Sequence, residues 1–400
     1  MSHTVNIISI LGVNISTLNK KEILEKIKRF LKDGKQHQVV TPNPEFLLSA
    51  KKDEEFFYIL NNADLAIPDG IGLKFAGWAM GKNIHRFAGA DLVKDILKIA
   101  RENNLKIAVL NWSGGLSNSA DIESAIKRDY SELQLLTLDI GREPRITNNE
   151  SRIINDFQPD ILFCTLGAPW QEKLIYHNLK NLSSVKLAIG IGGAFDFLTG
   201  KIKRAPGLMR RLGLEWLWRL FKQPRRWKRI CNAVIAFPAL FLKWRFILPF
   251  LYRPNVACML YKKDNNKFKI LIVERADDGG HWQLPQGGTD GEDVEKAGER
   301  ELREELGTDK FRIRKIYQNL WKYKFGKEDK SGKILGYKGQ KQSLAIAEFL
   351  GKDEDIKINF WDHSGWKWVD AENLINEVHP VRRDAAEIFL EKFYQVTGSR

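Results

Sequence analysis

Apolar and polar residues form two different patterns along the chain, and the first pattern covers residues 1 to about 200. Short apolar runs of strand length alternate there with longer stretches in which apolar residues recur with helical spacing. Strands are predicted at residues 5–11, 38–41, 65–67, 106–110, 133–138, 161–165 and 187–191. Helices are predicted between them, among others at residues 20–31, 91–102, 117–129 and 170–181. This alternation predicts an α/β domain with a mainly parallel sheet and helices on both faces.

A different pattern of apolar and polar residues begins near Pro254. Two apolar runs, 255–261 and 268–274, flank the turn residues that start at Asp264 and predict a β-hairpin. The further predicted elements are a glycine-rich loop at 286–291, helices at about 293–306 and 383–394, and strands at 311–318 and 343–349. Strands and helices in this order predict an α+β domain with a mixed sheet.

Between the two patterns lies a basic segment followed by an apolar one. Residues 201–229 contain eleven Lys or Arg residues and one acid, Glu215. In residues 230–252 the only charged side chains are Lys243 and Arg245. We therefore predict three parts: an α/β core at 1–200, a basic and apolar appendage at 201–252, and a second domain at 253–400.

Composition narrows the class of protein. The 400 residues are 43% hydrophobic and 28% charged, which is typical of a globular chain and argues against a disordered or fibrous one. The net charge of +14 predicts an anionic partner, such as nucleic acid, a membrane surface or a phosphorylated substrate. Cys164, Cys231 and Cys258 are too far apart in sequence to indicate a disulfide scaffold or a zinc site.

The most specific chemistry lies on the predicted helix at 293–306. Glu301, Glu304 and Glu305 stand at i, i+3 and i+4, so a helix places all three carboxylates on one face. Such carboxylates repel one another unless a cation neutralises them, and their oxygens prefer hard ions such as Mg²⁺ or Mn²⁺. A bound ion of this kind polarises a diphosphate and activates water. A solvated acidic helix face is the alternative.

The surrounding residues resemble the Nudix box, G-x5-E-x7-REUxEExGU with U apolar. The match is complete from Glu292 to Gly307, while the loop from Gly287 to Glu292 is one residue short and Thr308 replaces the last apolar residue. The resemblance implies a mixed sheet sandwiched by helices. It implies metal binding by Glu301, Glu304 and Glu305, with Glu304 and Glu305 catalytic. It also implies substrate binding by Gly287, Gly288 and Arg300, and ion pairs through which Arg300 orients the glutamates.

Residues that flank the Nudix box indicate which subgroup of Nudix proteins the sequence resembles. Residues 282–288 and 337–342 look like those of RNA pyrophosphohydrolases and diadenosine polyphosphate hydrolases, which implies a nucleotide or an RNA 5′-phosphate as substrate. Glu348, on a later predicted strand, is a candidate additional metal ligand or base. The shortened loop leaves a second interpretation open, in which this domain binds phosphate or RNA without catalysis.

In the first domain, the candidate residues lie on loops that follow predicted strands, where parallel sheets bind ligands. Asp69, in a Pro-Asp-Gly turn, can act as a general base on a sugar hydroxyl, or it can simply stabilise the turn. Gln171 opens a helix and its amide can bind sugar or phosphate. The backbone N–H groups of Gly192 and Gly193 can bind phosphate.

Taken together, these loops resemble the WecG/TagA/CpsF family of bacterial glycosyltransferases. The matching segments are residues 41–45, 66–72, 89–92, 159–162, 167–173, 192–197, 200–206 and 213–220. The resemblance covers about residues 5–230 and implies a Rossmann-like domain. It implies inverting transfer of an N-acetylated hexosamine, such as N-acetylmannosamine, from a UDP-sugar donor to an undecaprenyl-diphosphate-linked acceptor, without an obligate metal.

The same resemblance assigns roles to individual residues. Asp69 is the candidate catalytic base, and Thr41, Asn43 and Gln171 are candidates for positioning substrate. In the appendage, the candidate diphosphate-binding residues are Arg219, Arg226 and Arg229. Arginine forks can compensate the negative charge that develops on the leaving UDP. A solvated basic face remains the alternative for these arginines.

The apolar stretch at 230–252 is long enough to span a bilayer. Lys243 and Arg245 are costly at the bilayer centre, and Pro238 is expected to interrupt a helix. We therefore favour an interfacial segment on an anionic membrane, over nucleic-acid binding as the rival interpretation. With no signal peptide in the N-terminal residues, the expected location is cytoplasmic, peripheral on the inner face of the bacterial plasma membrane. The sequence leaves the oligomeric state open, a homo-oligomer included.

Overall fold

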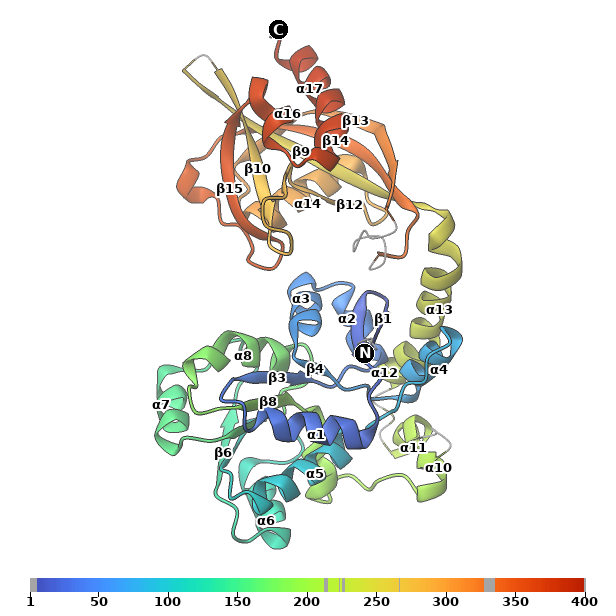
Figure 1. The fold of residues 1–400 in the computed structure, drawn as a ribbon, viewed down its shortest axis with the longest axis vertical. Helices are drawn as coiled ribbons and strands as arrows, with labels where there is room; N and C mark the ends of the chain where they lie inside the picture. The colour runs from blue at the N-terminus through green and yellow to red at the C-terminus, as the bar shows by residue number, and fades with distance from the viewer. Residues whose placement is uncertain are drawn as a thin grey trace. The chain divides into compact units, whose positions relative to one another are not determined.

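The computed structural model describes residues 6–211, 215–222, 224, 227–265, 267–326 and 335–398. At Arg210, Arg211, Arg219 and Lys222 it describes the backbone alone. The chain divides into two compact units, Met1–Lys243 and Trp244–Arg400 (Figure 1).

The first unit is built on a parallel sheet of six strands in the order β4-β3-β8-β7-β5-β6. The strands are β3 (His37–Val40), β4 (Leu65–Ala66), β5 (Ile107–Trp112), β6 (Leu135–Ile140), β7 (Ile161–Cys164) and β8 (Leu187–Gly190). Successive residues of β5 enter two separate cores: Val109 packs in one, and Ala108 and Leu110 pack in the other. Both faces of the sheet are therefore covered, which confirms the predicted α/β class.

Helices of this unit follow the strands. They are α1 (Lys20–Phe30), α2 (Pro44–Ala50), α3 (Glu54–Asn62), α4 (Ile71–Ala79), α5 (Gly89–Glu102), α6 (Ser119–Asp129), α7 (Asn148–Phe157), α8 (Trp170–Asn178), α9 (Phe195–Leu198), α10 (Gly207–Arg211) and α11 (Glu215–Lys222). Several begin at residues that satisfy free backbone N–H groups: Asn19 forms a capping box with Glu22, and Thr147 forms one with Glu150.

The predicted strand at 5–11 does not join the parallel sheet. It forms β1 (Ile7–Ile10), which pairs with β2 (Val13–Ser16) in a separate antiparallel hairpin. Leu11 and Gly12, the two residues between the strands, both have positive φ, at 51° and 85°. Such a two-residue turn matches the twist of a hairpin, and it returns the chain on itself before a crossover helix can begin.

The expectation that Pro238 interrupts a helix is wrong. The chain is helical from Trp227 to Phe250, through α12 (Trp227–Cys231), a π-helical stretch (Asn232–Ala236), α13 (Phe237–Leu242), a second π-helical stretch (Lys243–Ile247) and a 3₁₀ turn (Leu248–Phe250). Pro238 lies in the first turn of α13, directly after π-helical backbone, and this change of pitch accommodates a residue without an N–H group.

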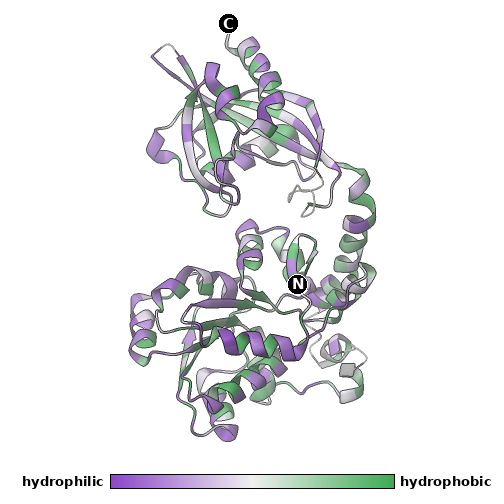
Figure 2. Ribbon diagram, viewed as in Figure 1, coloured by the Kyte–Doolittle hydropathy of each residue, from purple (hydrophilic) through white to green (hydrophobic). Residues whose placement is uncertain are grey.

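This helix is apolar along most of its length (Figure 2). Among the described residues, it alone is long and apolar enough to cross a membrane, with a mean hydropathy of 1.6 and 22% of its most apolar window buried. That criterion rests on length and composition only. The choice between a spanning and an interfacial helix therefore stays open.

The second unit is built on a mixed sheet of seven strands. They are β9 (Tyr252–Asp264), β10 (Lys267–Arg275), β11 (Trp282–Gln283), β12 (Gln286–Gly288), β13 (Phe311–Lys324), β14 (Gly339–Phe349) and β15 (His363–Asp370). The central path is β11-β10-β9-β14-β13, while β12 pairs with β9 and β15 pairs with β10. The pair β9–β14 is parallel and the other pairs are antiparallel.

Helices cover both faces of this mixed sheet. They are α14 (Val294–Leu306), α16 (Leu374–Glu377) and α17 (Arg383–Thr397). Along β9, Val256 and Cys258 pack in the core that contains residues of α14, while Ala257 and Met259 pack in the core that contains residues of α17. The predicted sandwich of a mixed sheet between helices is confirmed.

Candidate active sites

In the first unit, the loops that follow β3, β7 and β8 are joined by hydrogen bonds. Thr41, after β3, is buried, and its hydroxyl donates to the carbonyl of Gly190 at 3.0 Å. The side-chain oxygen of Gln171 accepts from the backbone N–H groups of Gly167 at 3.1 Å and Gly192 at 2.9 Å. The carboxyl ends of parallel strands meet at one edge of a sheet, and these bonds fix the loops of that edge together.

Both polar atoms of the Gln171 side chain form hydrogen bonds within the protein. Its side chain is buried, and its amide nitrogen donates to Glu172 Oε1 at 2.6 Å. Asn43 is similarly engaged, because its side-chain oxygen caps α2 by accepting from the N–H groups of Glu45 and Phe46. Contacts of either residue with substrate stay predictions.

Glu172 is a buried acid that sequence analysis did not single out. Burial raises its pKa to about 8. The folded protein therefore holds a proton on Glu172 that the unfolded chain releases above its ordinary pKa of 4.5. Because the folded state binds more protons between these two values, stability falls as the pH rises from about 4.5 to about 8.

Glu172→Gln is expected to remove this pH dependence, because a neutral amide needs no proton to stay buried. We expect the melting temperature of the variant to change less between pH 5 and about 8 than that of the parent chain. Asp129→Asn, at an exposed position, serves as control. An equal pH dependence in parent and Glu172→Gln would contradict the assignment.

Asp69 lies in the loop between β4 and α4, as predicted from its Pro-Asp-Gly turn. Its backbone N–H donates to the carbonyl of Pro42 at 2.8 Å, which holds the turn against the β3 loop. Its half-buried carboxylate lies 3.7 Å from Arg86 Nε and 3.5 Å from the backbone nitrogen of Gly89. The carboxylate is thus oriented by a cation and still reaches solvent.

Arg86 is a residue that sequence analysis missed. Burial lowers its pKa, but Asp69 and Glu215 raise it more, so the guanidinium pKa lies above its ordinary value. The contact with Glu215 is short, at 2.6 Å between Nη2 and Oε2. Arg86 therefore connects the Asp69 loop to the start of α11, in the basic appendage.

Two further arginines lie close to each other near this loop edge. Arg142, which sequence analysis also missed, follows β6, stacks 3.4 Å from the centre of the Trp112 ring and donates to the carbonyl of Leu166 at 2.9 Å. Partial burial and the charge of Arg229 lower its pKa. Arg229 in turn contacts Glu45 of α2 at 3.0 Å. Of the other two predicted arginines, the Arg219 side chain and Arg226 lie outside the described residues.

The two glycines after β8 form a tight turn. Gly192 has a φ of +49°, and a Cβ at Gly193 would lie 2.8 Å from Asp196 Oδ2. The N–H group of Gly192 already donates to Gln171, whereas Gly193 is exposed. A phosphate contact of these groups stays a prediction.

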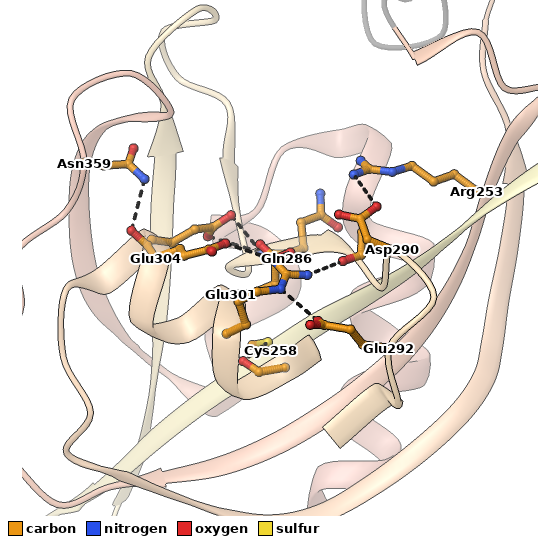
Figure 3. Close-up of polar contacts among 12 residues, drawn as sticks. Arg253, Cys258, Gln286, Asp290, Glu292, Glu301, Glu304 and Asn359 are labelled. Carbon is orange, nitrogen blue, oxygen red and sulfur yellow. Dashed lines mark hydrogen bonds and ion pairs between the residues drawn. The ribbon is translucent and has the colours of Figure 1, made fainter. Parts of the chain in front are cut away.

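In the second unit, α14 carries the three glutamates as predicted. It begins after its cap Asp293 and ends before Gly307, which has a left-handed φ of 62°. The side chains of Glu301 and Glu305 are buried and that of Glu304 is exposed. Figure 3 shows Glu301 and Glu304 beside Gln286 of β12.

Arg300 lies at the centre of this cluster. Its Nη1 donates to Glu301 and to Glu304, both at 2.8 Å, and its Nε donates to Glu292 at 2.9 Å. Its Nη2 donates to the carbonyl of Gly288 at 2.7 Å. Burial disfavours the charge, yet the surrounding carboxylates raise the Arg300 pKa above its ordinary value.

His363 and Arg253 are further neighbours that sequence spacing did not reveal. His363 Nε2 lies 3.1 Å from Glu305 Oε2, and the Gln286 N–H donates to the same carboxylate at 3.3 Å. Arg253 packs against Gly288, where a Cβ would lie 2.3 Å from its Nη2. Both residues lie far from α14 in sequence, so no local motif connects them to it.

The structure does not bring Glu348 to the glutamate cluster. Its neighbours Ala345 and Ala347 on β14 face the core of α14, so strand alternation directs Glu348 to the opposite face of the sheet. There it pairs with Arg314, whose Nε lies 2.8 Å from Glu348 Oε2.

The donor set on α14 fits a divalent cation in its chemistry. Glu301 and Glu304 already converge on one cationic nitrogen of Arg300, and carboxylate oxygens are the ligands that Mg²⁺ and Mn²⁺ prefer. As arranged here, however, the described part of the chain contains no group of three or more His, Cys, Asp or Glu placed to hold a metal ion. Metal ligation by Glu301, Glu304 and Glu305 stays a prediction.

Gly287→Ala is expected to lower metal-dependent hydrolysis by about 10- to 100-fold, because a Cβ there would lie 2.0 Å from the Glu301 carboxyl and displace it. Hydrolysis rates at increasing metal concentration measure the effect. Gly279→Ala is the matched control, since a Cβ at Gly279 meets open space. Parent-like hydrolysis in Gly287→Ala would show that the Glu301 position is unimportant.

Comparisons with known proteins match each unit separately. The model of the glycosyl transferase WecG/TagA/CpsF family matches residues 8–249, and that of the NUDIX domain matches residues 251–391. A Bacillus subtilis N-acetylglucosaminyldiphosphoundecaprenol N-acetyl-beta-D-mannosaminyltransferase is 32% identical over 216 residues, which are 54% of this chain and 83% of that protein. A Wolbachia pipientis RNA pyrophosphohydrolase is 37% identical over 155 residues, which are 36% of this chain and 91% of that protein.

One solved structure similar to the second unit is the E. coli dihydroneopterin triphosphate pyrophosphohydrolase. It is 20% identical and has a TM-score of 0.29, and the match covers 36% of this chain and 99% of that chain.

Proposed function

Because the chain belongs to the glycosyl transferase WecG/TagA/CpsF family and, in its C-terminal part, to the NUDIX family, we propose that it joins two enzymes that both act on diphosphates. The first is a glycosyltransferase and the second is a Nudix pyrophosphohydrolase. The observation that carries this proposal is that each compact unit holds its own candidate site. Asp69 and its cationic neighbours belong to the first unit, and the glutamates of α14 belong to the second.

The transferase moves an N-acetylated hexosamine, of the N-acetylmannosamine type, from a UDP-sugar to a polyprenyl-diphosphate-linked acceptor. The name of the Bacillus subtilis relative supports this choice of sugar and acceptor. Asp69 accepts the proton of the acceptor hydroxyl while that oxygen attacks the anomeric carbon, and the bond to UDP breaks with inversion. Arg86 orients the Asp69 carboxylate for this step.

The leaving UDP develops negative charge, and arginines compensate it without an obligate metal. Arg142 and Arg229 are the described candidates, because they lie close to each other near the loop edge and are both exposed. Arg219 and Arg226 remain candidates from the sequence. Thr41, Asn43 and Gln171 contribute by fixing the loops around the substrates.

The hydrolase cleaves a nucleoside diphosphate linkage in a nucleotide or an RNA 5′-phosphate, as the name of the Wolbachia relative suggests. Glu301, Glu304 and Glu305 would hold Mg²⁺ or Mn²⁺, which when bound polarises the diphosphate and activates water. Arg300 holds Glu301 and Glu304 in position, and Gly287 and Gly288 leave room for Glu301 and Arg253.

The appendage at 201–252 holds the protein on the inner face of the plasma membrane. The low burial of the apolar helix Trp227–Phe250 supports this location, as do the exposed cations Lys243 and Arg245 within it. Membrane attachment also brings the transferase to a lipid-linked acceptor.

The proposal is tested by mass spectrometry of the products that the purified full chain forms from UDP-N-acetylhexosamines and a short-chain lipid diphosphate acceptor. We expect a mass increase of one N-acetylhexosamine on the acceptor. A parallel screen with Mg²⁺ covers dinucleoside polyphosphates, triphosphorylated RNA and nucleotide sugars. Failure to hydrolyse any of them would favour the interpretation of the second domain as a phosphate- or RNA-binding module.

A further inference from the structure

The helix α4 begins directly after the Asp69 loop and exposes two large aromatic side chains. Phe75 is 63% exposed and Trp78 is 79% exposed. They stand at i and i+3, so they lie next to each other on one helix face. No large apolar side chain in the described part of the chain is more exposed than Trp78. Neighbouring aromatic side chains exposed to water are typical of a surface that contacts a partner or a membrane.

Packing fixes α4 against the apolar helix of the same unit. A Cβ at Gly72 would lie 3.4 Å from the ring of Phe237, which is buried at the start of α13. Figure 1 draws α4 beside α13. The apolar helix itself exposes Trp227, Val234, Ile235 and Leu242 within this unit. The helix that carries the two exposed aromatic residues therefore packs directly on an apolar element that is already a candidate for membrane contact.

The charged residues of α4 and of the segment that follows it, residues 70–90, are all basic. No Asp or Glu occurs between Asp69 and Asp91, whereas Lys74 and Lys82 are exposed. Lys74 stands four residues before Trp78, which places the ammonium group beside the aromatic pair. Aromatic residues flanked by cations suit the headgroup region of an anionic membrane. A second copy of this surface would instead bring like charges together, which disfavours self-association through it.

We propose that α4 is a second membrane contact, in which Phe75 and Trp78 enter the interface of an anionic lipid surface and hold the Asp69 loop at headgroup level. The role in catalysis rests on the proposed transferase function, whereas the membrane contact does not. Because α4 begins at Ile71, two residues after Asp69, the depth of its aromatic face sets the height of the Asp69 carboxylate above the membrane. A polyprenyl diphosphate carries its diphosphate and sugar at that level.

The test compares the full chain with Phe75→Ser/Trp78→Ser in co-sedimentation with vesicles of phosphatidylcholine and phosphatidylglycerol. We expect the double variant to bind these vesicles about 10-fold more weakly or worse, since two large apolar side chains no longer enter the interface. Leu350→Ser removes another exposed apolar side chain, 54% exposed, from the second unit and is expected to bind like the parent. Parent-like binding of the double variant would overturn the proposal.

Rates of sugar transfer to two acceptors distinguish a membrane contact of α4 from a direct role of α4 in catalysis. With a short-chain soluble acceptor, the double variant is expected to transfer sugar at the parent rate; with a long-chain acceptor in vesicles, the rate should fall. Equal losses with both acceptors would overturn the proposal, because α4 would then support the active site itself. If the parent chain transfers no sugar to either acceptor, the proposed transferase function fails, while the vesicle measurement still decides the membrane contact.

The charge variant Lys74→Glu/Lys82→Glu leaves the aromatic residues in place. It is expected to weaken binding to phosphatidylglycerol-containing vesicles and to leave binding to pure phosphatidylcholine unchanged. Analytical ultracentrifugation of the parent and of Phe75→Ser/Trp78→Ser tests whether a second copy of the chain binds this surface instead of a membrane. Dissociation of a parent oligomer in the double variant, with vesicle binding unchanged, would identify the surface as a contact between copies and overturn the proposal.

Discussion

Asp69→Asn is expected to lower sugar transfer by about 10²- to 10⁴-fold, the usual contribution of a general base. The amide keeps the size of the side chain but no longer accepts the proton of the acceptor hydroxyl. The backbone bond from Asp69 to Pro42 is unaffected, and Arg86 keeps its contact with Glu215, so the loop should stay in place. The measurement is the initial rate of transfer from a UDP-sugar to a short-chain lipid diphosphate.

The control for Asp69→Asn is hydrolysis by the second unit of the same protein. Because Asp69 belongs to the first unit, pyrophosphate hydrolysis should equal that of the parent chain. Asp129→Asn, an exposed substitution on α6, should leave both activities unchanged. If Asp69→Asn abolished both activities in a well-folded protein, the assignment of two separate sites would be wrong.

Glu304→Gln with Glu305→Gln is expected to produce the reverse pattern, a loss of hydrolysis by about 10²-fold or more with sugar transfer retained. Each substitution removes a negative charge that the proposed metal ion requires. Glu304 is exposed, so Glu304→Gln alone tests charge without disturbing the core. Glu305 is buried near His363, and its single variant needs a melting curve beside the rate measurement.

Glu299→Gln is the matched control for the glutamate variants. It lies on the same helix and pairs with Arg303, away from the cluster around Arg300. Its hydrolysis rate at saturating metal should equal that of the parent. A loss in Glu299→Gln as large as in Glu304→Gln would mean that helix charge in general, rather than a metal site, controls the rate.

Local sequence signals predicted the framework of both sites because each signal acts within a few residues. Asp293 and Gly307 mark the two ends of α14 by capping chemistry, and the spacing of its glutamates defines one face. Asp69 was predicted from a turn that directly follows a strand. In each case, the chain segment that carries the signal also adopts the structure.

The partners of these residues were missed because they come from distant segments. Arg86, Arg142 and His363 have no pattern in their own surroundings that connects them to a site, and only the tertiary fold brings them to Asp69, Arg229 and Glu305. The same limitation applies to Gln171, whose position at the start of a helix indicated an amide able to bind sugar or phosphate. Its burial between two loops depends on the tertiary fold and has no local signal.

The hydrogen bonds of Gln171 have a consequence for exchanging loops between relatives. One amide oxygen accepts from the loops after β7 and β8 together, so neither loop has an independent conformation. A chimera that takes only one of these loops from a relative would lose a hydrogen bond that Gln171 forms between them. We therefore expect a folded chimera only when both loops and the glutamine are exchanged together.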